Sequence, residues 1–260
     1  MKKKKTVATI ILGVVLLGVL YAVYLGVFFA VTAVDSQKTR EKMLTWQNER
    51  LKSLKSGYEQ GVFEKIDETS ICADDVTDET KLNELRFLGT HNSYKNGIEK
   101  TAKNFFNYAL FTEKYDYALP SVTEQLNQGI RAFEIDVGKV VRDGETTFES
   151  SHKYFSDNKS SIMDTLKGFS EIKMWSDYNK GHLPVILQVE IKNKGITANK
   201  YDTTAEDIYL FESKVKQIMG ETLFTPKDAL DGNEDFETLR KKDAYPILNK
   251  LRGKIIVFLQ

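Results

Sequence analysis

The sequence predicts an α/β fold in which parallel strands alternate with helices, preceded by a helix that spans a membrane. Short apolar runs bounded by turn residues recur from residue 85 onward, and amphipathic helical segments separate the later runs. Such alternation favours parallel βα units with the helices on the outside. Near the N-terminus, a run without any charged residue is longer than the roughly 20 residues that a membrane-spanning helix needs.

The charge-free run extends from Thr6 to Val34 and follows the lysines at positions 2 to 5. The apolar part of a cleaved signal peptide is only about 7–15 residues long, so the length favours an uncleaved anchor. Residues 30–33 resemble a cleavage site, but the apolar stretch before them is too long. Lysines before the span favour a cytoplasmic N-terminus and an exported remainder. The globular part is therefore expected on the extracytoplasmic side. Basic residues after the span weaken this signal: Lys38, Arg40 and Lys42.

We divide the chain into three parts. Residues 1–35 hold the lysines and the transmembrane anchor, residues 36–80 form a charged stalk and linker, and residues 81–260 form the catalytic part. Within the second part, residues 36–56 are dense in charged side chains and carry apolar residues at helical spacing, which predicts a solvated helix. Residues 61–80 have clustered acidic residues and no periodicity, which is typical of a linker.

Composition excludes several classes of function. The chain has 260 residues and a formal net charge of 0, and without the lysines at positions 2–5 the remainder is at −4. Nucleic-acid binding usually requires a basic excess, so no nucleic-acid partner is expected. The single cysteine, Cys72, rules out an internal disulfide and a cysteine-rich zinc site. Composition leaves the oligomeric state open.

Five strand-like runs are expected in the catalytic part: Leu85–Gly89, Ile130–Val137, Thr147–Ser151, Pro184–Ile191 and Lys254–Leu259. Helices are expected over Ser160–Lys180 and Ala205–Met219, because apolar residues recur there near a 3.6-residue period and a glycine follows each segment. The runs are apolar on both faces, as buried parallel strands are.

Carboxylates are placed within two of these runs. Glu134 and Asp136 are two residues apart in one strand, so their side chains share a face. Two neighbouring carboxylates in an apolar strand repel each other and lose hydration unless a cation lies between them. Glu190 and Lys192 repeat the spacing in a later strand. A lone pair of this kind is more often an exposed edge pair, and Arg131 and Lys192 either contact a ligand or only neutralise the carboxylates.

Together with the amide oxygen of Asn92, the three carboxylates form an all-oxygen ligand set. Such a set suits Ca²⁺, suits Mg²⁺ less well and suits zinc poorly. His91 and His152 are then free to transfer protons. The third histidine, His182, lies in a turn before a strand and is expected to be structural. All these groups occur at strand ends, which favours one shared functional site over an independent structural role for each residue.

The motifs of residues 85–260 occur in an order that resembles a known superfamily. They are Gly89-Thr90-His91-Asn92-Ser93-Tyr94, Gln125-Leu126, Gly129 to Val137, His152, and Pro184 to Leu187 followed by Glu190 and Lys192. This order is similar to that of the phosphoinositide-specific phospholipase C superfamily. Trp175, Pro246 and Leu251 to Lys254 resemble its calcium-dependent, mostly microbial branch. Sphingomyelinases D share the two-histidine, Glu-x-Asp pattern and remain an alternative.

The resemblance implies a TIM-type barrel and a Ca²⁺-assisted cleavage of a phosphodiester in a phospholipid. In the family, residues matching Asn92, Glu134, Asp136 and Glu190 bind calcium. His91 would act as a base or stabilise the developing phosphorane, and His152 would protonate the leaving glycerol oxygen. The inositol 2-hydroxyl would attack its own phosphate, and Lys192 would contact that phosphate.

The strand count is lower than the resemblance requires. A TIM barrel usually has about 250 residues and eight strands, so we expect a barrel truncated after about five strands. Two other functions stay open: a glycerophosphodiesterase or sphingomyelinase D-like phosphodiesterase, and a catalytically inactive barrel that binds a lipid headgroup or a protein partner. The presence of both histidines and all the carboxylates favours an enzyme.

An aromatic segment follows the first strand and is expected at the active-site face. Its members are Phe105, Phe106, Tyr108, Phe111, Tyr115 and Tyr117. Aromatic side chains suit the bilayer interface, but they are more often buried, so packing on the barrel rim is favoured over insertion.

Overall fold

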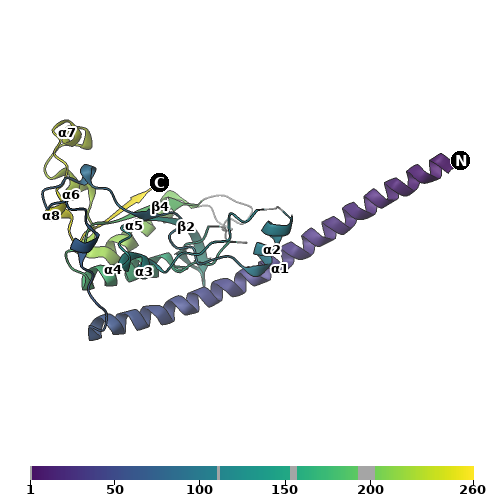
Figure 1. The fold of residues 1–260 in the computed structure, drawn as a ribbon, viewed down its shortest axis with the longest axis horizontal. Helices are drawn as coiled ribbons and strands as arrows, with labels where there is room; N and C mark the ends of the chain where they lie inside the picture. The colour runs from purple at the N-terminus through teal and green to yellow at the C-terminus, as the bar shows by residue number, and fades with distance from the viewer. Residues whose placement is uncertain (1, 110–111, 153–156, 193–202) are drawn as a thin grey trace.

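A computed structural model describes residues 2–109, 112–152, 157–192 and 203–260, so Phe111 of the aromatic segment lies outside the described residues. Helix α1, Lys2–Gln60, is a single helix that runs along one side of an α/β body. Its second half lies against the body, and its first half projects beyond it (Figure 1). Among the described residues, this is the one helix long and apolar enough to cross a membrane, as an anchor or a signal sequence would be.

The body is built on a sheet with five strands in the described part of the chain: β1 Gly89–Thr90, β2 Ala132–Arg142, β3 Glu145–Glu149, β4 Val185–Ile191 and β5 Ile255–Leu259. Strands β1, β2, β4 and β5 are neighbours in that order and run parallel. The prediction of an α/β fold with a parallel sheet is therefore confirmed. Over the described residues the sheet is open, with β1 and β5 at its edges.

Strand β3 is not a further parallel strand, which corrects the prediction for residues 147–151. It pairs antiparallel with β2, which continues beyond Val137 to Arg142. The turn between the two strands is Asp143-Gly144, and both residues have a positive φ, 53° and 84°. A two-residue hairpin turn needs this conformation, and Asp-Gly is one of the sequences that favour it. The first predicted strand is also shorter than expected, because only Gly89 and Thr90 of that region pair with β2.

Seven helices follow α1 in the described residues: α2 Lys100–Ala109, α3 Val122–Asn127, α4 Thr165–Tyr178, α5 Ala205–Met219, α6 Pro226–Leu230, α7 Phe236–Lys241 and α8 Leu248–Leu251. Short 3₁₀ turns occupy Glu68–Ile71, Leu82–Glu84 and Gly220–Thr222. Helix α5 has the predicted bounds. Helix α4 begins later than predicted, because the side chain of Asp164 accepts a hydrogen bond from the backbone of Lys167 and caps the helix there.

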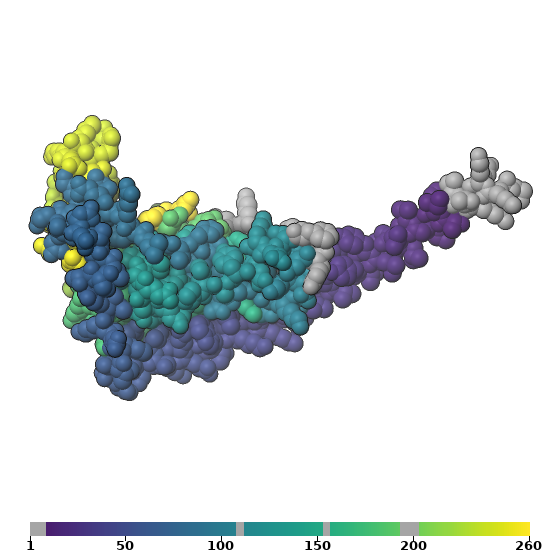
Figure 2. All heavy atoms as spheres, in the orientation of Figure 1, coloured from purple at the N-terminus to yellow at the C-terminus, as the bar shows by residue number. Residues whose placement is uncertain are grey.

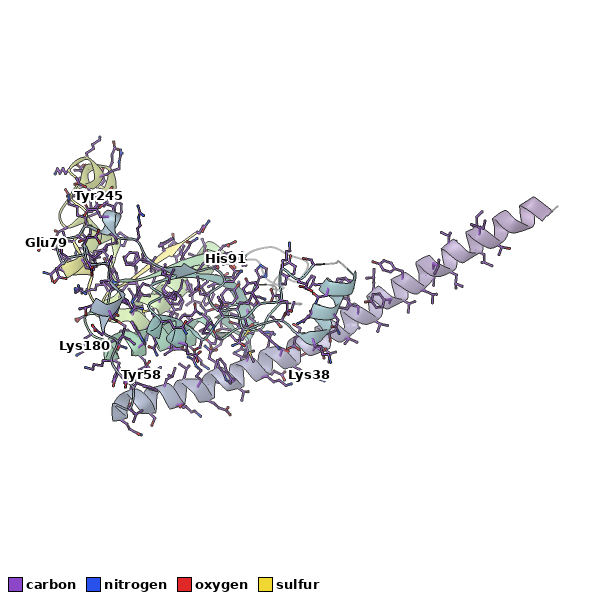
Figure 3. All side chains as sticks on the ribbon, viewed as in Figure 1. Lys38, Tyr58, Glu79, His91, Lys180 and Tyr245 are labelled. Carbon is purple, nitrogen blue, oxygen red and sulfur yellow. The ribbon has the colours of Figure 1, made fainter. Side chains whose placement is uncertain are left out.

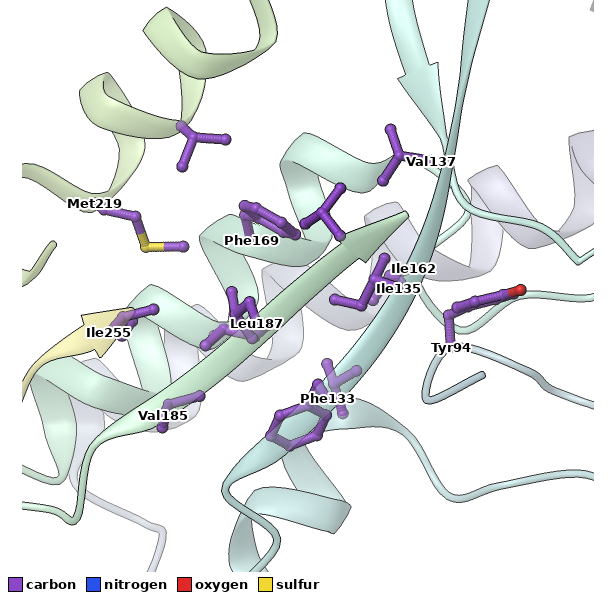
Figure 4. Close-up of a cluster of buried hydrophobic side chains, with 14 of the residues drawn as sticks. Tyr94, Phe133, Ile135, Val137, Ile162, Phe169, Val185, Leu187, Met219 and Ile255 are labelled. Carbon is purple, nitrogen blue, oxygen red and sulfur yellow. The ribbon is translucent and has the colours of Figure 1, made fainter. Parts of the chain in front are cut away.

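One face of the sheet packs on helices α4 and α5. Ile135 of β2 and Leu187 of β4 are fully buried there against Phe169 of α4 and Met219 of α5 (Figure 4). Each such side chain stabilises the fold by about 1.5–3 kcal/mol. Because strand residues alternate between faces, the neighbouring even-numbered positions point to the opposite face. The carboxylates of β2 and β4 are therefore on the face that the helices do not cover, and the strands are not apolar on both faces.

The segment 36–56 is helical as predicted, but one of its faces packs on the body while the other is exposed to solvent. The amide of Gln47 is fully buried and exchanges two hydrogen bonds with the backbone of Asp164, at 2.9 and 2.8 Å. Arg50 donates to Glu171 of α4 at 2.6 Å, and Glu171 is itself fully buried. The packed face differs from the expectation of a solvated helix, because its polar side chains have partners more than 100 residues away, which helical periodicity does not reveal.

Arg50→Ala should destabilise the full chain in detergent by about 3 kcal/mol, because removing one partner of a buried ion pair leaves the other charge uncompensated. Burial already raises the pKa of Glu171 above its usual value, and Arg50 opposes that shift. The loss should therefore shrink as pH falls and Glu171 takes up a proton. Equilibrium unfolding in urea measures the change, with the exposed Lys52→Ala as the matched control. Equal stability of both variants would contradict the docking role of this pair.

Candidate active site

The structure brings the three predicted carboxylates together. The β2–β4 register pairs Asp136 directly with Glu190 and places Glu134 opposite Gln188. One oxygen each from Glu134, Asp136 and Glu190 lies within 4.8 Å of the others. The cluster lies toward the carboxyl ends of the parallel strands, which is where βα folds gather their functional side chains.

Asp136 is the most buried member of the cluster, with 1% of its surface exposed. Its Oδ2 accepts a hydrogen bond from the Tyr94 hydroxyl at 2.7 Å. Its Oδ1 has no hydrogen-bond partner among the described residues, although Lys192 Nζ approaches to 3.2 Å as an ion pair. Burial, reinforced by the neighbouring Glu134, raises the pKa of Asp136 to about 6, against the opposing effects of Tyr94 and Lys192.

Lys192 lies between two carboxylates of the cluster. Its Nζ is 2.5 Å from Glu190 Oε1, and the side chain is 38% exposed. Partial burial alone would lower its pKa, but the hydrogen bond to Glu190 and the charge of Asp136 raise the pKa above its usual value. The ammonium group thus neutralises part of the negative charge and still reaches solvent, where it can meet a ligand.

The loop after β1 is held against β2 by hydrogen bonds. Asn92 adopts a left-handed conformation, with φ of 51°, which asparagine tolerates better than most residues. Its backbone N–H donates to Glu134 Oε2 at 2.6 Å, and its side-chain Oδ1 accepts from the Tyr94 hydroxyl at 2.8 Å. Burial and Asp136 raise the pKa of Tyr94 well above its usual value. The protonated hydroxyl therefore lies between the Asn92 amide oxygen and the Asp136 carboxylate, and these two acceptors share its single proton.

One candidate histidine begins this loop, and the other follows β3. His91 is exposed at the end of β1, and its Nδ1 is 3.1 Å from Asn92 Nδ2. His152 is about a quarter exposed, and its Nδ1 is 2.9 Å from Asp157 Oδ2. The β2–β3 hairpin explains how His152 reaches this place, because Glu149 at the end of β3 pairs with Gly138, two residues beyond Asp136.

Sequence reasoning missed the residues that connect the two histidines. Asp157 is buried and ion-paired with Lys95, which is itself 1% exposed. The Lys95 ammonium lies 4.8 Å from the centre of the Tyr117 ring, and the Tyr117 hydroxyl accepts from Asn92 Nδ2 at 2.9 Å. A chain of contacts therefore runs from His91 through Asn92 to His152, in which hydrogen bonds and ion pairs are joined by the cation–π contact of Lys95 with Tyr117. Only the position of Asp157, five residues after His152, was a signal in the sequence.

Arg131 is not part of this cluster, which corrects its predicted contact with a ligand. It precedes β2, is 1% exposed, and donates to the backbone oxygens of Leu126 and Ile130. Its charge is paired with Glu68, and its guanidinium lies 4.8 Å from the centre of the Trp175 ring. All these partners lie at the amino ends of the strands, so Arg131 fixes the base of the body.

His182 also lies at the base of the body and is fully buried. Its Nε2 is 2.7 Å from the Ser176 hydroxyl, and its Nδ1 is 2.5 Å from the backbone oxygen of Leu183. Burial lowers the pKa of His182, so the ring stays neutral. These contacts agree with the structural role expected for this histidine.

The donors of the cluster fit a hard divalent cation. Calcium takes six to eight oxygen ligands, mostly from carboxylates and amide oxygens, and the cluster offers three carboxylates beside the Asn92 amide oxygen. The buried Oδ1 of Asp136 is an acceptor without a hydrogen bond from the described residues, which a bound cation would satisfy. The described residues near the cluster contribute no thiolate that would favour a softer metal.

Comparison with known proteins shows the family of the chain. Residues 80–155 and 152–260 match the family described as phosphoinositide phospholipase C, Ca²⁺-dependent. The chain belongs to this family, whose members are calcium-dependent. No curated protein matches the chain.

Comparison with a solved structure of TM-score above 0.5 supports the fold. The calcium-dependent phosphoinositol-specific phospholipase C of a Pseudomonas species aligns with a TM-score of 0.51 and 19% identity, covering 75% of this chain and 62% of that enzyme. The enzyme of Streptomyces antibioticus aligns with a TM-score of 0.47 and 20% identity, over 71% of this chain and 53% of its own. The chain thus spans less than two thirds of the length of these enzymes.

Calcium should raise the thermal midpoint of the full chain in detergent, because a ligand that binds only the folded state stabilises it by about 2.7 kcal/mol at 100 times its Kd. Glu134→Gln should abolish the shift. Glu145→Gln, which removes the same charge from the exposed start of β3, is the matched control and should keep it. A shift retained by Glu134→Gln would place the metal elsewhere.

The calcium-induced shift should also be larger at pH 7.5 than at pH 5. In the calcium-free protein the raised pKa of Asp136, about 6, means that the folded state holds this proton more tightly than the unfolded state. That contribution favours folding below pH 6 and is lost as pH rises through 6. Calcium must displace the proton at pH 5, which weakens apparent binding by about tenfold. Calcium titrations followed by thermal unfolding at both pH values measure this; equal affinities would contradict the assignment of Asp136 as a ligand.

Proposed function

We propose that the chain is a membrane-anchored, calcium-dependent phosphodiesterase of the phosphatidylinositol phospholipase C type, which cleaves the headgroup phosphodiester of a glycerophospholipid. One observation carries the proposal: two histidines and three carboxylates converge around the loop after β1 and the carboxyl ends of β2 and β4. Membership of the phospholipase C family supports the choice of reaction.

We also propose that residues 81–260, with their parallel sheet, form the N-terminal portion of a TIM-type barrel, behind an anchor of residues 1–35 and a helical segment and linker of residues 36–80. The outer edge of β5 supports this, because Phe258 and Leu259 are 45% and 43% exposed. An apolar groove beside that edge is lined by Phe211 and Val215 of α5 and by Val257. A further strand and helix of a barrel would pack there.

In the proposed site, Asn92, Glu134, Asp136 and Glu190 would hold calcium. The cation, when bound, supplies positive charge where negative charge develops on the phosphate during displacement. Lys192, which reaches solvent beside Glu190, would contact a phosphate oxygen. The network around Tyr94 and Asn92 holds these groups in place before the substrate arrives.

The histidines would move the protons. The 2-hydroxyl of the inositol ring attacks the phosphorus while the bond from phosphorus to the glycerol oxygen breaks. His91 is exposed at the mouth of the site and would take the hydroxyl proton. His152 would give a proton from Nε2 to the glycerol oxygen, because Asp157 accepts the hydrogen bond from Nδ1 and stabilises the protonated ring.

His91→Ala and His152→Ala should each lower turnover of phosphatidylinositol in detergent micelles by about 10² or more, the usual range for proton-transfer groups. The measurement is release of inositol phosphate in the presence of calcium. Both variants should keep the calcium-induced thermal shift, since neither ring is a proposed ligand. His182→Asn is the control: it alters a buried histidine far from the carboxylates and should lower stability but keep turnover per folded molecule.

Three outcomes are informative. Release of a headgroup from lipids without a hydroxyl next to the phosphate would favour a glycerophosphodiesterase or sphingomyelinase D-like reaction. Binding of calcium and lipid without hydrolysis would favour an inactive, headgroup-binding protein. Full turnover by His91→Ala would contradict the proposed assignment of protons.

A further inference from the structure

Helix α1 passes from the charge-free run into the body without a break. Its first half stands clear of the body as a single rod (Figure 2), and large apolar side chains from Ile10 to Val34 are exposed along it. An α-helix rises about 1.5 Å per residue and is stiff over this length. The position of the body relative to the apolar half is therefore fixed by where the second half docks.

The order of contacts along α1 shows which end of the body faces the apolar half. Near the start of the docked half, Ser36 accepts from Asn158 at 2.6 Å and Arg40 pairs with Glu149 at 2.7 Å. Glu149 precedes His152 in the sequence and Asn158 follows it. At the far end, Tyr58 packs on Tyr178, with ring centres 4.9 Å apart. In Figure 3, Tyr58 lies with Lys180 at one end of the body, and Lys38 lies toward the free half of the helix. The active-site end therefore faces the apolar half.

A chain of aromatic contacts leads from the apolar half to the active site. Phe28, inside the charge-free run, stacks on Phe105 of α2 with ring centres 4.0 Å apart. Phe105 contacts Phe106 at 6.0 Å, Phe106 contacts Tyr115 at 4.7 Å, and Tyr115 contacts His152 at 5.9 Å. Helix α2 is also tied to α1 by a hydrogen bond from Thr101 to Asp35 at 2.8 Å.

These contacts set the depth of α2. Phe28 lies six residues before Val34, the end of the charge-free run, which is about 9 Å along the helix axis. A helix that lies in the membrane interface buries its apolar face by about 5–10 Å. Phe105 and Phe106 are therefore at the level of the interface when the charge-free run spans the bilayer, and aromatic side chains favour that level.

We propose that the docking of α1 places the active site on the surface of the bilayer that holds its own anchor, with α2 seated in the interface. The chain would then act on phospholipid of its own bilayer and not on lipid of a neighbouring one. This inference rests on the proposed function for its substrate. The placement of α2 is an independent structural claim and is tested without catalysis.

The first experiment measures depth. The full chain carrying Phe106→Trp is reconstituted in phosphatidylcholine vesicles whose acyl chains are brominated near the headgroup. Its fluorescence should be quenched at least twofold more than that of the wild type, whose native tryptophans are Trp46, in the docked half of α1, and Trp175, in α4. Seven residues inserted between Val34 and Asp35 add nearly two helical turns, about 10.5 Å, and keep the facing of the body within about 20°. This insertion should remove the extra quenching; equal quenching with and without it would overturn the placement of α2.

The second experiment measures whether the protein hydrolyses lipid of the bilayer that holds it or of a neighbouring bilayer. Wild-type chain is reconstituted in phosphatidylinositol vesicles with one label and mixed with protein-free vesicles carrying another. Lipid in its own vesicles should be hydrolysed at least tenfold faster than lipid in the others. The insertion should lower that rate at least tenfold, yet keep turnover in detergent micelles and the calcium-induced thermal shift, which show that the body is folded. Equal hydrolysis of both vesicles would overturn the inference, whereas absence of hydrolysis in micelles would overturn the proposed function and leave the depth measurement to decide the docking.

Discussion

The site depends on the burial of Asp136 beside two other carboxylates. Side chains alternate between the two faces of a strand, and the odd-numbered ones of β2 and β4, such as Ile135 and Leu187, face the helices. The even-numbered side chains therefore share the opposite face. Direct pairing of Asp136 with Glu190 then concentrates negative charge in a place with little water. The Tyr94 hydroxyl and the Lys192 ammonium offset part of the free-energy cost of this concentrated charge. One oxygen of Asp136 still has no hydrogen bond from the described residues. A bound cation would satisfy this oxygen and offset the repulsion among the carboxylates.

The two ends of the body differ in how their charged groups are paired. At the base, Arg131 and Glu68 form a buried pair that is closed by backbone oxygens and the Trp175 ring. At the active-site end, Lys192 reaches solvent. A closed ion pair fixes structure, whereas an exposed cation beside carboxylates can exchange partners when a ligand arrives. Two cations were predicted at the site, Arg131 and Lys192. This difference explains why only Lys192 is in a position to bind a ligand.

Periodicity in the sequence was sufficient for the parallel strands, for helix α5 and for the carboxylates that share a face. It was insufficient where a partner lies far along the chain. The buried pair Lys95–Asp157 and the docking of Gln47 depend on contacts across more than 60 residues, and no local pattern encodes them. The hairpin that contains β3 is a different case, because its Asp143-Gly144 turn was visible and was not used.

The docking of α1 and the position of His152 depend on the same contacts. The chain on either side of His152 is held by the same helix, through Arg40 to Glu149 before it and Ser36 to Asn158 after it. Asn158 is adjacent to Asp157, whose carboxylate is 2.9 Å from the His152 ring nitrogen. A helix that moved away from the body would therefore release both ends of this segment and the carboxylate that orients the histidine. In this architecture, the helix proposed as the membrane anchor also holds the segment that carries His152, the proposed proton donor.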